Sequence, residues 1–261
     1  MNTAQTRLAI ADLTATLATD FDVPTVLHAV AQHARQCFDA ASAAVILFDG
    51  RRSGGSGIQI VAEAMREDIL ADPHLHISGP GLSSARDGAV AMLADLDDDS
   101  VEFHRWPDYR RRAREAGLRS VRAFPIKAMA QPLGSLVVHD DKPWGNERPN
   151  DFGQILADLT AIALSMGTEH GRATTTADTV AAVLDGTSVV ATAVGILAEY
   201  FDLDLDAARA RLRRLARAHQ LTPTEQATAI VSAQNRNPRD PGTDPALHFP
   251  ADLTPPRHID R

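Results

Sequence analysis

The stretch Thr187–Val231 decides the fold of the C-terminal part of the chain and reads TSVVATAVGILAEYFDLDLDAARARLRRLARAHQLTPTEQATAIV. Apolar residues recur every three or four positions in three successive runs, which is the pattern of amphipathic helices. Asp204 is placed to cap the second helix, and Thr222 with Glu225 has the spacing of a capping box before the third. Three short helices must bury their apolar stripes against one another, so the stretch predicts a small all-α three-helix bundle.

The second predicted helix carries five arginines in a chain whose formal net charge is −8. Arg209, Arg213 and Arg217 form an i, i+4 row beside the apolar stripe, whereas Arg214 and Arg211 lie further around the solvent side. One interpretation is a phosphate-binding face for nucleic acid. The other is an ordinary solvated helix face, and composition alone favours it because charge runs are commonly just solvated.

The pattern from Val190 to Val231 resembles ANTAR, the RNA-binding transcription antitermination domain. The matching positions are Ala193, Gly195, Ile196, Leu197, Ala208, Leu212, Arg213, Ala216, Leu221 and Ala227. With this resemblance, Arg209, Arg213, Arg214 and Arg217 become the predicted RNA-binding residues. Glycine inside a helix costs about 1 kcal/mol relative to alanine, so Gly195 predicts a close helix approach, with Ala193 and Ala208 at the same structural contact.

The sequence also departs from the ANTAR pattern at three positions. The family usually has a basic residue where Thr187 stands, a lysine where Val194 stands and an aromatic residue where Arg209 stands. Two expected phosphate-contacting positions are therefore uncharged. A regulator that kept the bundle but acts through protein–protein interaction remains the alternative to RNA binding.

Composition limits the classes of protein that need to be considered. With 261 residues, the chain holds one large or two small domains, and 44% hydrophobic with 23% charged residues is ordinary for a soluble globular protein. The acidic balance permits only a local basic site for nucleic acid. Cys37 is the single cysteine, which excludes an internal disulfide. We find no signal peptide and no apolar run of roughly 20 residues, so we expect a cytoplasmic protein without a membrane span.

The first two thirds of the chain predict an α+β domain with a mainly antiparallel sheet flanked by helices. Asp22 is placed to cap a helix that Pro24 opens, Gly117 to end another, and Pro125 implies an edge or a bulge in its strand. Helices are expected over residues 3–19, 24–38, 82–87, 107–116 and 151–167, and strands over residues 43–48, 58–64, 89–93, 120–127 and 132–139.

Five pieces of this region resemble GAF domains of the kind found ahead of ANTAR domains. They read GPGLSSA, AMLADL, RWPDY, AGLRSVRAFPIK and LGSLVVH, and the resemblance covers about residues 20 to 168. It implies a site for an unidentified small molecule lined by residues roughly 65 to 115, and no cofactor is evident. The family often has cysteine after Gly-Pro, but here Gly81 and Leu82 follow, so thiol chemistry at that position is absent.

Neither a metal site nor a catalytic centre is predicted in this domain. His74 and His76 would share one face of an extended segment with His104 nearby, but we favour imidazoles in a loop near the surface over metal ligands. The acidic run 95–99 lacks the ligand spacing of a calcium loop. Trp106 is assigned to core packing. The motifs of hydrolases, metalloproteases and nucleotide-binding enzymes are missing, and one cysteine cannot support the methionine sulfoxide reduction of some GAF proteins, so a GAF enzyme is the least favoured alternative.

The sequence therefore predicts a chain of five parts. They are an N-terminal helix (1–19), a GAF-like sensor domain (20–168), a helical connector (169–186), an ANTAR-like RNA-binding bundle (187–233) and a disordered, proline-rich tail (234–261). In the connector, the threonines 174–176 could cap a helix over 177–184, which would be interrupted or bent at Asp185 and Gly186. Apolar stripes on residues 3–19 and 151–167 could pair across a two-fold axis, which predicts a homodimer.

Taken together, these features predict a signal-responsive regulator. By resemblance, the bundle would bind hairpins in nascent transcripts and prevent a terminator from forming, with phosphates and unpaired loop bases as its targets. Its expected partners are RNA and a second copy of the chain.

Overall fold

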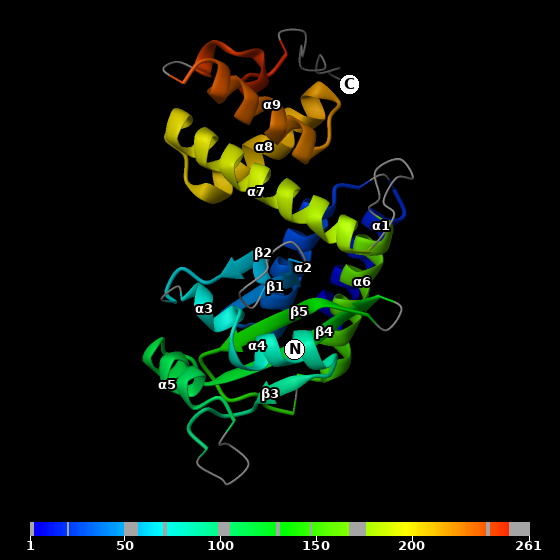
Figure 1. The fold of residues 1–261 in the computed structure, drawn as a ribbon, viewed down its shortest axis with the longest axis vertical. Helices are drawn as coiled ribbons and strands as arrows, with labels where there is room; N and C mark the ends of the chain where they lie inside the picture. The colour runs from blue at the N-terminus through cyan, green and yellow to red at the C-terminus, as the bar shows by residue number, and fades with distance from the viewer. Residues whose placement is uncertain are drawn as a thin grey trace, which may run out of the picture. The chain divides into compact units, whose positions relative to one another are not determined.

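A computed structural model describes residues 3–19, 21–49, 57–69, 72–98, 105–128, 131–146, 148–166, 176–238 and 241–250. The chain divides into two compact units, Met1–Leu184 and Asp185–Arg261 (Figure 1). The first unit is α+β and the second is helical, as the sequence predicts.

A five-stranded sheet forms the middle layer of the first unit. Its order is β2-β1-β5-β4-β3, and each neighbouring pair is antiparallel. Pro125 lies beyond the three residues of β4 that pair with β3, and one residue before a register shift toward β5, which confirms the expected edge or bulge. The strands are β1 (Ser42–Phe48), β2 (Ile58–Met65), β3 (Ala91–Leu93), β4 (Ser120–Ala128) and β5 (Gln131–Asp140).

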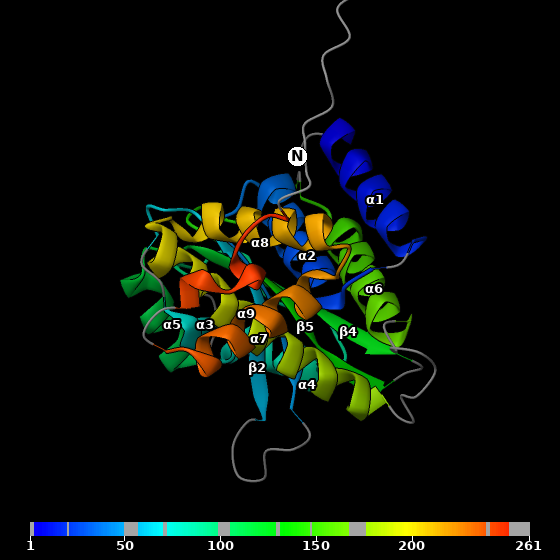
Figure 2. The same cartoon turned by 90° about the horizontal axis from the view of Figure 1, so that it is seen from above.

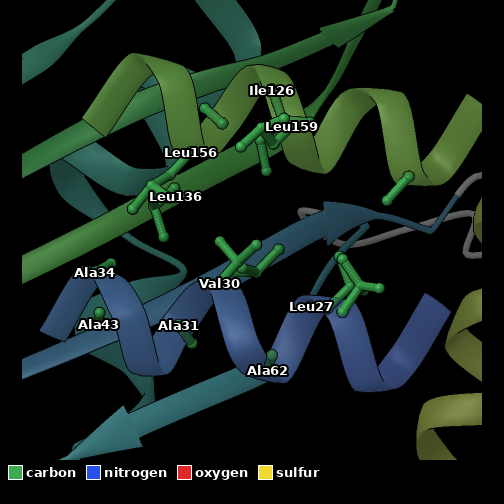
Figure 3. Close-up of a cluster of buried hydrophobic side chains, with 14 of the residues drawn as sticks. Leu27, Val30, Ala31, Ala34, Ala43, Ala62, Ile126, Leu136, Leu156 and Leu159 are labelled. Atoms are coloured by element: carbon green, nitrogen blue, oxygen red, sulfur yellow. The ribbon is translucent and has the colours of Figure 1, made fainter. Parts of the chain in front are cut away.

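Three helices cover one face of this sheet: α1 (Thr3–Leu17), α2 (Val23–Phe38) and α6 (Asn150–Met166). Side chains alternate along the strands, so Leu136 and Val138 of β5 join this core while Val137 faces the other side. Figure 3 shows leucine, valine and alanine side chains of α2 and α6 meeting those of the strands between the two helices. Helix α1 lies alongside α6 at the margin of this layer (Figure 2).

The ends of these elements follow the local signals in the sequence. The Asp22 carboxylate accepts a hydrogen bond from the Thr25 backbone N–H at 3.1 Å, and Pro24 lies in the first turn of α2. Gly117 follows the end of a helix with a φ of +79°, a conformation that favours glycine. Both predicted boundaries are confirmed.

The other face of the sheet carries α3 (Pro73–His76), α4 (Gly79–Asp87) and α5 (Pro107–Glu115) (Figure 1). Helix α4 lies directly on the strands, because Ser84 donates to the Ala123 carbonyl at 3.1 Å and Ser135 donates to the Gly81 carbonyl at 2.9 Å. A Cβ at Gly81 would come within 2.2 Å of the His76 carbonyl oxygen, so only glycine fits this approach.

The second unit is built from the later turns of α7 (Thr176–Phe201), α8 (Leu205–His219) and α9 (Pro223–Arg236). Helix α7 is continuous, so the expected break at Asp185 and Gly186 is wrong. The apolar stripe of α7 continues across that dipeptide, with Val183 and Leu184 buried before it and Ala193 after it. The threonines 174 and 175, expected to cap this helix, lie outside the described residues.

The expected disordered tail is wrong for residues 241–250, hereafter the C-terminal segment. These residues form two 3₁₀ turns, η3 (Pro241–Thr243) and η4 (Pro245–Leu247), which contact α9 (Figure 1). The tail has many prolines and few apolar residues, which is why it was expected to be disordered. Leu247 is nevertheless fully buried in the bundle core, and its burial stabilises the ordered segment.

One helix among the described residues, Val180–Phe201 within α7, is long and apolar enough to span a membrane by length and composition. The expectation that no run reaches this length is therefore wrong. Its apolar residues have protein partners, however: Val180 and Val183 belong to the core of the first unit, and Val194 and Leu197 to that of the second. These contacts bury 39% of the most apolar window of the helix.

Candidate nucleic-acid interface

The bundle core fixes which side of α8 is free. Ala208, Leu212, Leu215 and Ala216 of this helix are buried against α7 and α9. The Asp204 carboxylate accepts from the Ala207 N–H at 2.7 Å, which caps α8 as predicted. The remaining arc of the helix, which holds all five arginines, lies outside the core.

The third helix begins at the predicted capping box. The Glu225 N–H donates to the Thr222 hydroxyl at 3.2 Å, and the Thr222 N–H donates to the Glu225 carboxylate at 2.8 Å. This start orients α9 so that Ala227 and Ile230 close the core beneath α8.

Arg209, Arg213 and Arg217 form what we call the arginine edge, along one side of the buried stripe of α8. Arg209 and Arg213 are half-buried and Arg217 is exposed. Burial lowers the pKa of Arg209 from its usual range, and the neighbouring charge of Arg213 adds to that effect while Asp206 opposes it. No hydrogen bond or ion pair joins these three guanidinium groups to other residues of the described chain. These guanidinium groups therefore keep their hydrogen-bond donors available for an anion such as a phosphate.

Arg214 and Arg211 occupy the opposite side of the helix and differ from each other. Arg214 is exposed, and no described residue pairs with it. The guanidinium carbon of Arg211 lies 3.7 Å from the centre of the Phe201 ring and 5.3 Å from that of Phe249, and the same group donates to the Leu247 carbonyl at 3.1 Å. Arg211 thus fastens the C-terminal segment to α8, a role the sequence pattern alone did not indicate.

Three hydrogen bonds and ion pairs hold the C-terminal segment to the bundle in addition to Arg211, and one further bond, from the His248 ring, lies within the segment. Gln226 donates to the Ala246 carbonyl at 2.7 Å, His219 Nε2 lies 2.9 Å from the His248 carbonyl, the His248 ring bonds the Gly242 carbonyl, and Arg236 pairs with Asp244 at 2.6 Å. The signal in the sequence was the Leu-His-Phe triplet at 247–249, which places two apolar residues within the proline-rich tail.

Gly195 does not lie at a close helix contact within the described chain. It is exposed, and a Cβ added there would meet no atom within 4 Å, so the predicted close approach is wrong. Ala193 and Ala208, predicted at the same contact, are both fully buried in the bundle core. Val194 is also a core residue, at 2% exposure, so its place on α7 faces the bundle interior and not a phosphate. Thr187 is half-buried.

The first unit holds a group of polar side chains that we call the histidine cluster: the half-buried Glu63 and the buried His76, Tyr109 and His139. His139 Nε2 and the Tyr109 hydroxyl form a hydrogen bond of 2.8 Å, and His76 Nε2 donates to the Glu63 carboxylate at 2.8 Å. The rings of His76 and His139 lie 4.8 Å apart. The cluster joins β2, α3, α5 and β5 on the face of the sheet that carries α4.

The electrostatics of the histidine cluster follow from its burial. Burial lowers the pKa of His139 well below its usual value, and the charge of His76 lowers it further. Burial likewise raises the pKa of Tyr109, whereas the hydrogen bond from His76 lowers that of Glu63. His139 is therefore a neutral hydrogen-bonding group that holds β5 to α5.

The expected extended segment with two surface imidazoles is wrong. Residues 73–76 form the single turn α3, capped by Asp72, and His76 is buried at 3% exposure while His74 is exposed. His104 lies outside the described residues. Within the described ranges, no group of three or more His, Cys, Asp or Glu side chains is arranged to hold a metal ion.

Trp106 and the first carboxylates of the acidic run 95–99 both have partners in the first unit. Trp106 packs against the core on the α4 side and donates Nε1–H to the Ser83 hydroxyl at 3.0 Å, which confirms core packing. Asp95 accepts from Arg119 at 2.9 Å, and the Asp97 carboxylate pairs with the same guanidinium at 3.1 Å. These carboxylates are therefore engaged in ion pairs.

Comparison with protein families identifies both units. The model of the GAF domain matches residues 22–164, which is more than half of the chain. The chain belongs to the GAF domain family. The model of the ANTAR domain matches residues 178–231, so a GAF domain is followed here by an ANTAR domain. This is the arrangement of a regulatory protein in which a sensor-type domain precedes an output domain.

A solved GAF domain shares the fold of the first unit. The phycocyanobilin-bound GAF domain from a cyanobacterial phytochrome matches with a TM-score of 0.51 at 16% identity, covering 66% of this chain and 99% of that one. The chromophore-binding domain of a bacteriophytochrome from R. palustris matches with a TM-score of 0.47 at 15% identity, and the alignment covers 62% of this chain and 60% of that one. No significant match to a curated protein was found. At 16% identity, the match to the phycocyanobilin-bound domain shows the GAF fold and not a ligand.

Proposed function

We propose that this GAF–ANTAR chain is a signal-responsive, non-catalytic regulator that binds RNA hairpins in nascent transcripts and prevents transcription termination. The arginine edge and Arg214 contact the RNA. The place of action is the cytoplasm, where the regulator meets nascent transcripts.

The observation that carries this proposal is the contrast among the arginines of α8. Arg211 is committed to the C-terminal segment, whereas Arg209, Arg213 and Arg217 lie in a row with no partner among the described residues. Unpaired guanidinium groups on one edge of a helix in an acidic chain are suited to a local phosphate site. The ANTAR match covers this edge.

The sensor half of the proposal rests on the GAF match and on α7. This one helix contributes Val180 and Val183 to the core of the first unit and Ala193 and Leu197 to the core of the second. A signal that alters the packing of the first turns of α7 in the GAF domain therefore acts on a helix whose later turns belong to the ANTAR bundle. The signal is a small molecule that binds the GAF domain.

The proposal includes a homodimer. The buried stripe of α1 comprises Ala9, Leu13 and Leu17, which leaves Leu8 at 70% exposure on the same helix. On α6, Ile155 and Ile162 are also exposed, seven residues apart, together with Met166. Light scattering at micromolar concentration should give a dimer for the wild-type chain and a monomer for Ile162→Glu. A wild-type monomer would contradict this part of the proposal.

The alternative function is regulation through protein contacts without RNA. Its motivating observation is that Thr187 and Val194 replace expected basic residues, and Val194 is buried. The two functions are separated by an unbiased selection from a library of RNA hairpins with randomised loops, using the full chain. We expect enrichment of a hairpin class, with binding weakened by Arg209→Ala and by Arg213→Ala. Failure to enrich any hairpin would favour the protein-contact alternative.

A further inference from the structure

The C-terminal segment lies outside the residues that match the ANTAR model, yet it is part of the folded bundle. It fills the core with Leu247 and is fixed on both sides of that residue by Gln226 and His219. Phe249 follows two residues later on this fixed backbone. The backbone that carries its ring is therefore anchored up to the residue before it.

Phe249 combines exposure with a cationic neighbour. Phe249 is 41% exposed, although Leu247, two residues earlier in the chain, is fully buried. The guanidinium carbon of Arg211 lies 5.3 Å from the centre of this ring and 3.7 Å from the centre of the Phe201 ring. An aromatic ring that is partly exposed, carried on an anchored backbone and flanked by arginine is the feature on which unpaired bases stack in single-strand binding proteins.

The surroundings of Phe249 favour nucleic acid. Arg214 lies one helical turn beyond Arg211 and is exposed, and its charge contributes to lowering the pKa of Arg211. From Arg214 the arc of α8 continues to Arg217 and Arg213, so a row of positive charge leads to the aromatic ring. Phosphates of one strand can follow this arc while a base reaches Phe249.

Carboxylates limit where such a strand can run. Glu199 and Asp202 flank the partly exposed Tyr200 and Phe201 at the end of α7 and would repel phosphates there. The exposed arc of α8 lacks acidic residues from Arg209 to His219. A strand approaching Phe249 is therefore directed along α8.

We propose that Phe249, held against Arg211 by the folded C-terminal segment, is a stacking platform for an unpaired base of a hairpin loop. The RNA-binding surface then extends beyond residues 178–231 onto the C-terminal segment. This inference rests on the proposed RNA-binding function and adds a base-contacting residue to the phosphate-contacting arginines.

The test uses the full chain and the hairpin enriched in the selection described above, with affinity measured by fluorescence anisotropy. Phe249→Leu keeps an apolar side chain without a π face, and Phe249→Tyr and Phe249→Trp keep the π face. We expect Phe249→Leu to weaken binding roughly tenfold, and the two aromatic variants to bind within about twofold of the wild type. The salt dependence should be unchanged in all three, because no phosphate contact is lost.

A loop scan with abasic nucleotides completes the experiment. One abasic position should weaken wild-type binding and abolish the difference between the wild type and Phe249→Leu, since the stacked pair is already broken. Far-UV circular dichroism confirms that Phe249→Leu remains folded. Equal binding by Phe249→Leu and the wild type would overturn the inference, and so would tighter binding by Phe249→Leu, which would make the segment a restraint on RNA binding. If the wild type binds no hairpin, the proposed function fails and this inference fails with it.

Discussion

The guanidinium carbon of Arg211 lies 3.7 Å from the centre of the Phe201 ring, so the end of α7 and the middle of α8 are joined by a cation–π contact. The same guanidinium donates to the Leu247 carbonyl and thereby fastens the C-terminal segment. Five arginines on one helix therefore divide into one with a structural role and four that make no hydrogen bond or ion pair with the described residues.

Arg211→Ala should destabilise the bundle, whereas Arg214→Ala should not. Loss of the stacked guanidinium and its hydrogen bond is expected to cost about 1–2 kcal/mol, against less than about 0.5 kcal/mol for the exposed Arg214. Chemical unfolding followed by far-UV circular dichroism provides the comparison. Equal stability of the two variants would show that the C-terminal segment does not depend on Arg211.

The stability of the GAF domain should fall as the solution becomes acidic. Burial lowers the pKa of His139 in the folded state, so the unfolded chain binds the proton first, and stability is lost as the pH falls below the unfolded value of about 6.5. The loss from this residue between pH 7.5 and pH 5.5 is about 1.4 kcal/mol.

Urea unfolding followed by tryptophan fluorescence isolates this effect, because both tryptophans, Trp106 and Trp144, lie in the first unit. His139→Gln keeps a polar side chain without a titrating group in this pH range. The variant should be less stable at pH 7.5 and should lose less stability on acidification. The same pH dependence in the variant and the wild type would assign the effect to other groups.

Substituting two glycines by alanine should have opposite effects. Gly195 is exposed in α7 with open space at the Cβ position, so Gly195→Ala should stabilise the bundle by about 0.5–1 kcal/mol. Gly81→Ala would place its Cβ 2.2 Å from the His76 carbonyl oxygen and should destabilise the GAF domain by more than about 1 kcal/mol. Thermal unfolding checks both. Destabilisation by Gly195→Ala would contradict this expectation and would support the close helix approach that the sequence predicts at Gly195.

Local signals predicted most elements because their causes are local. The cap at Asp22, the capping box from Thr222 to Glu225 and the turn at Gly117 each depend on a few neighbouring residues, and each is confirmed. The alternation of Leu136, Val137 and Val138 similarly follows from strand geometry.

The errors arose where distant contacts decide the outcome. Asp185 and Gly186 were expected to break a helix, but burial of the apolar stripe on either side of them outweighs the unfavourable helix propensity of Gly186. The tail was expected to be disordered from its proline content, but Leu247 finds a place in the bundle core. His76 is buried because α3 and α4 fold over the sheet, and no spacing in the sequence reveals that.

The role of the arginine edge is tested most directly by the salt dependence of hairpin RNA binding. The edge variant, with Arg213→Gln and Arg217→Gln, removes two positive charges from this edge. The control variant, with Arg105→Gln and Arg111→Gln, removes two positive charges from exposed residues of the first unit. We expect the edge variant to bind all hairpins more weakly and to reduce the slope of log K against log salt by about 0.7–0.9 for each arginine. The slope of the control variant should equal that of the wild type. An unchanged slope in the edge variant, with the wild type binding RNA, would contradict the assignment of these arginines to RNA phosphates.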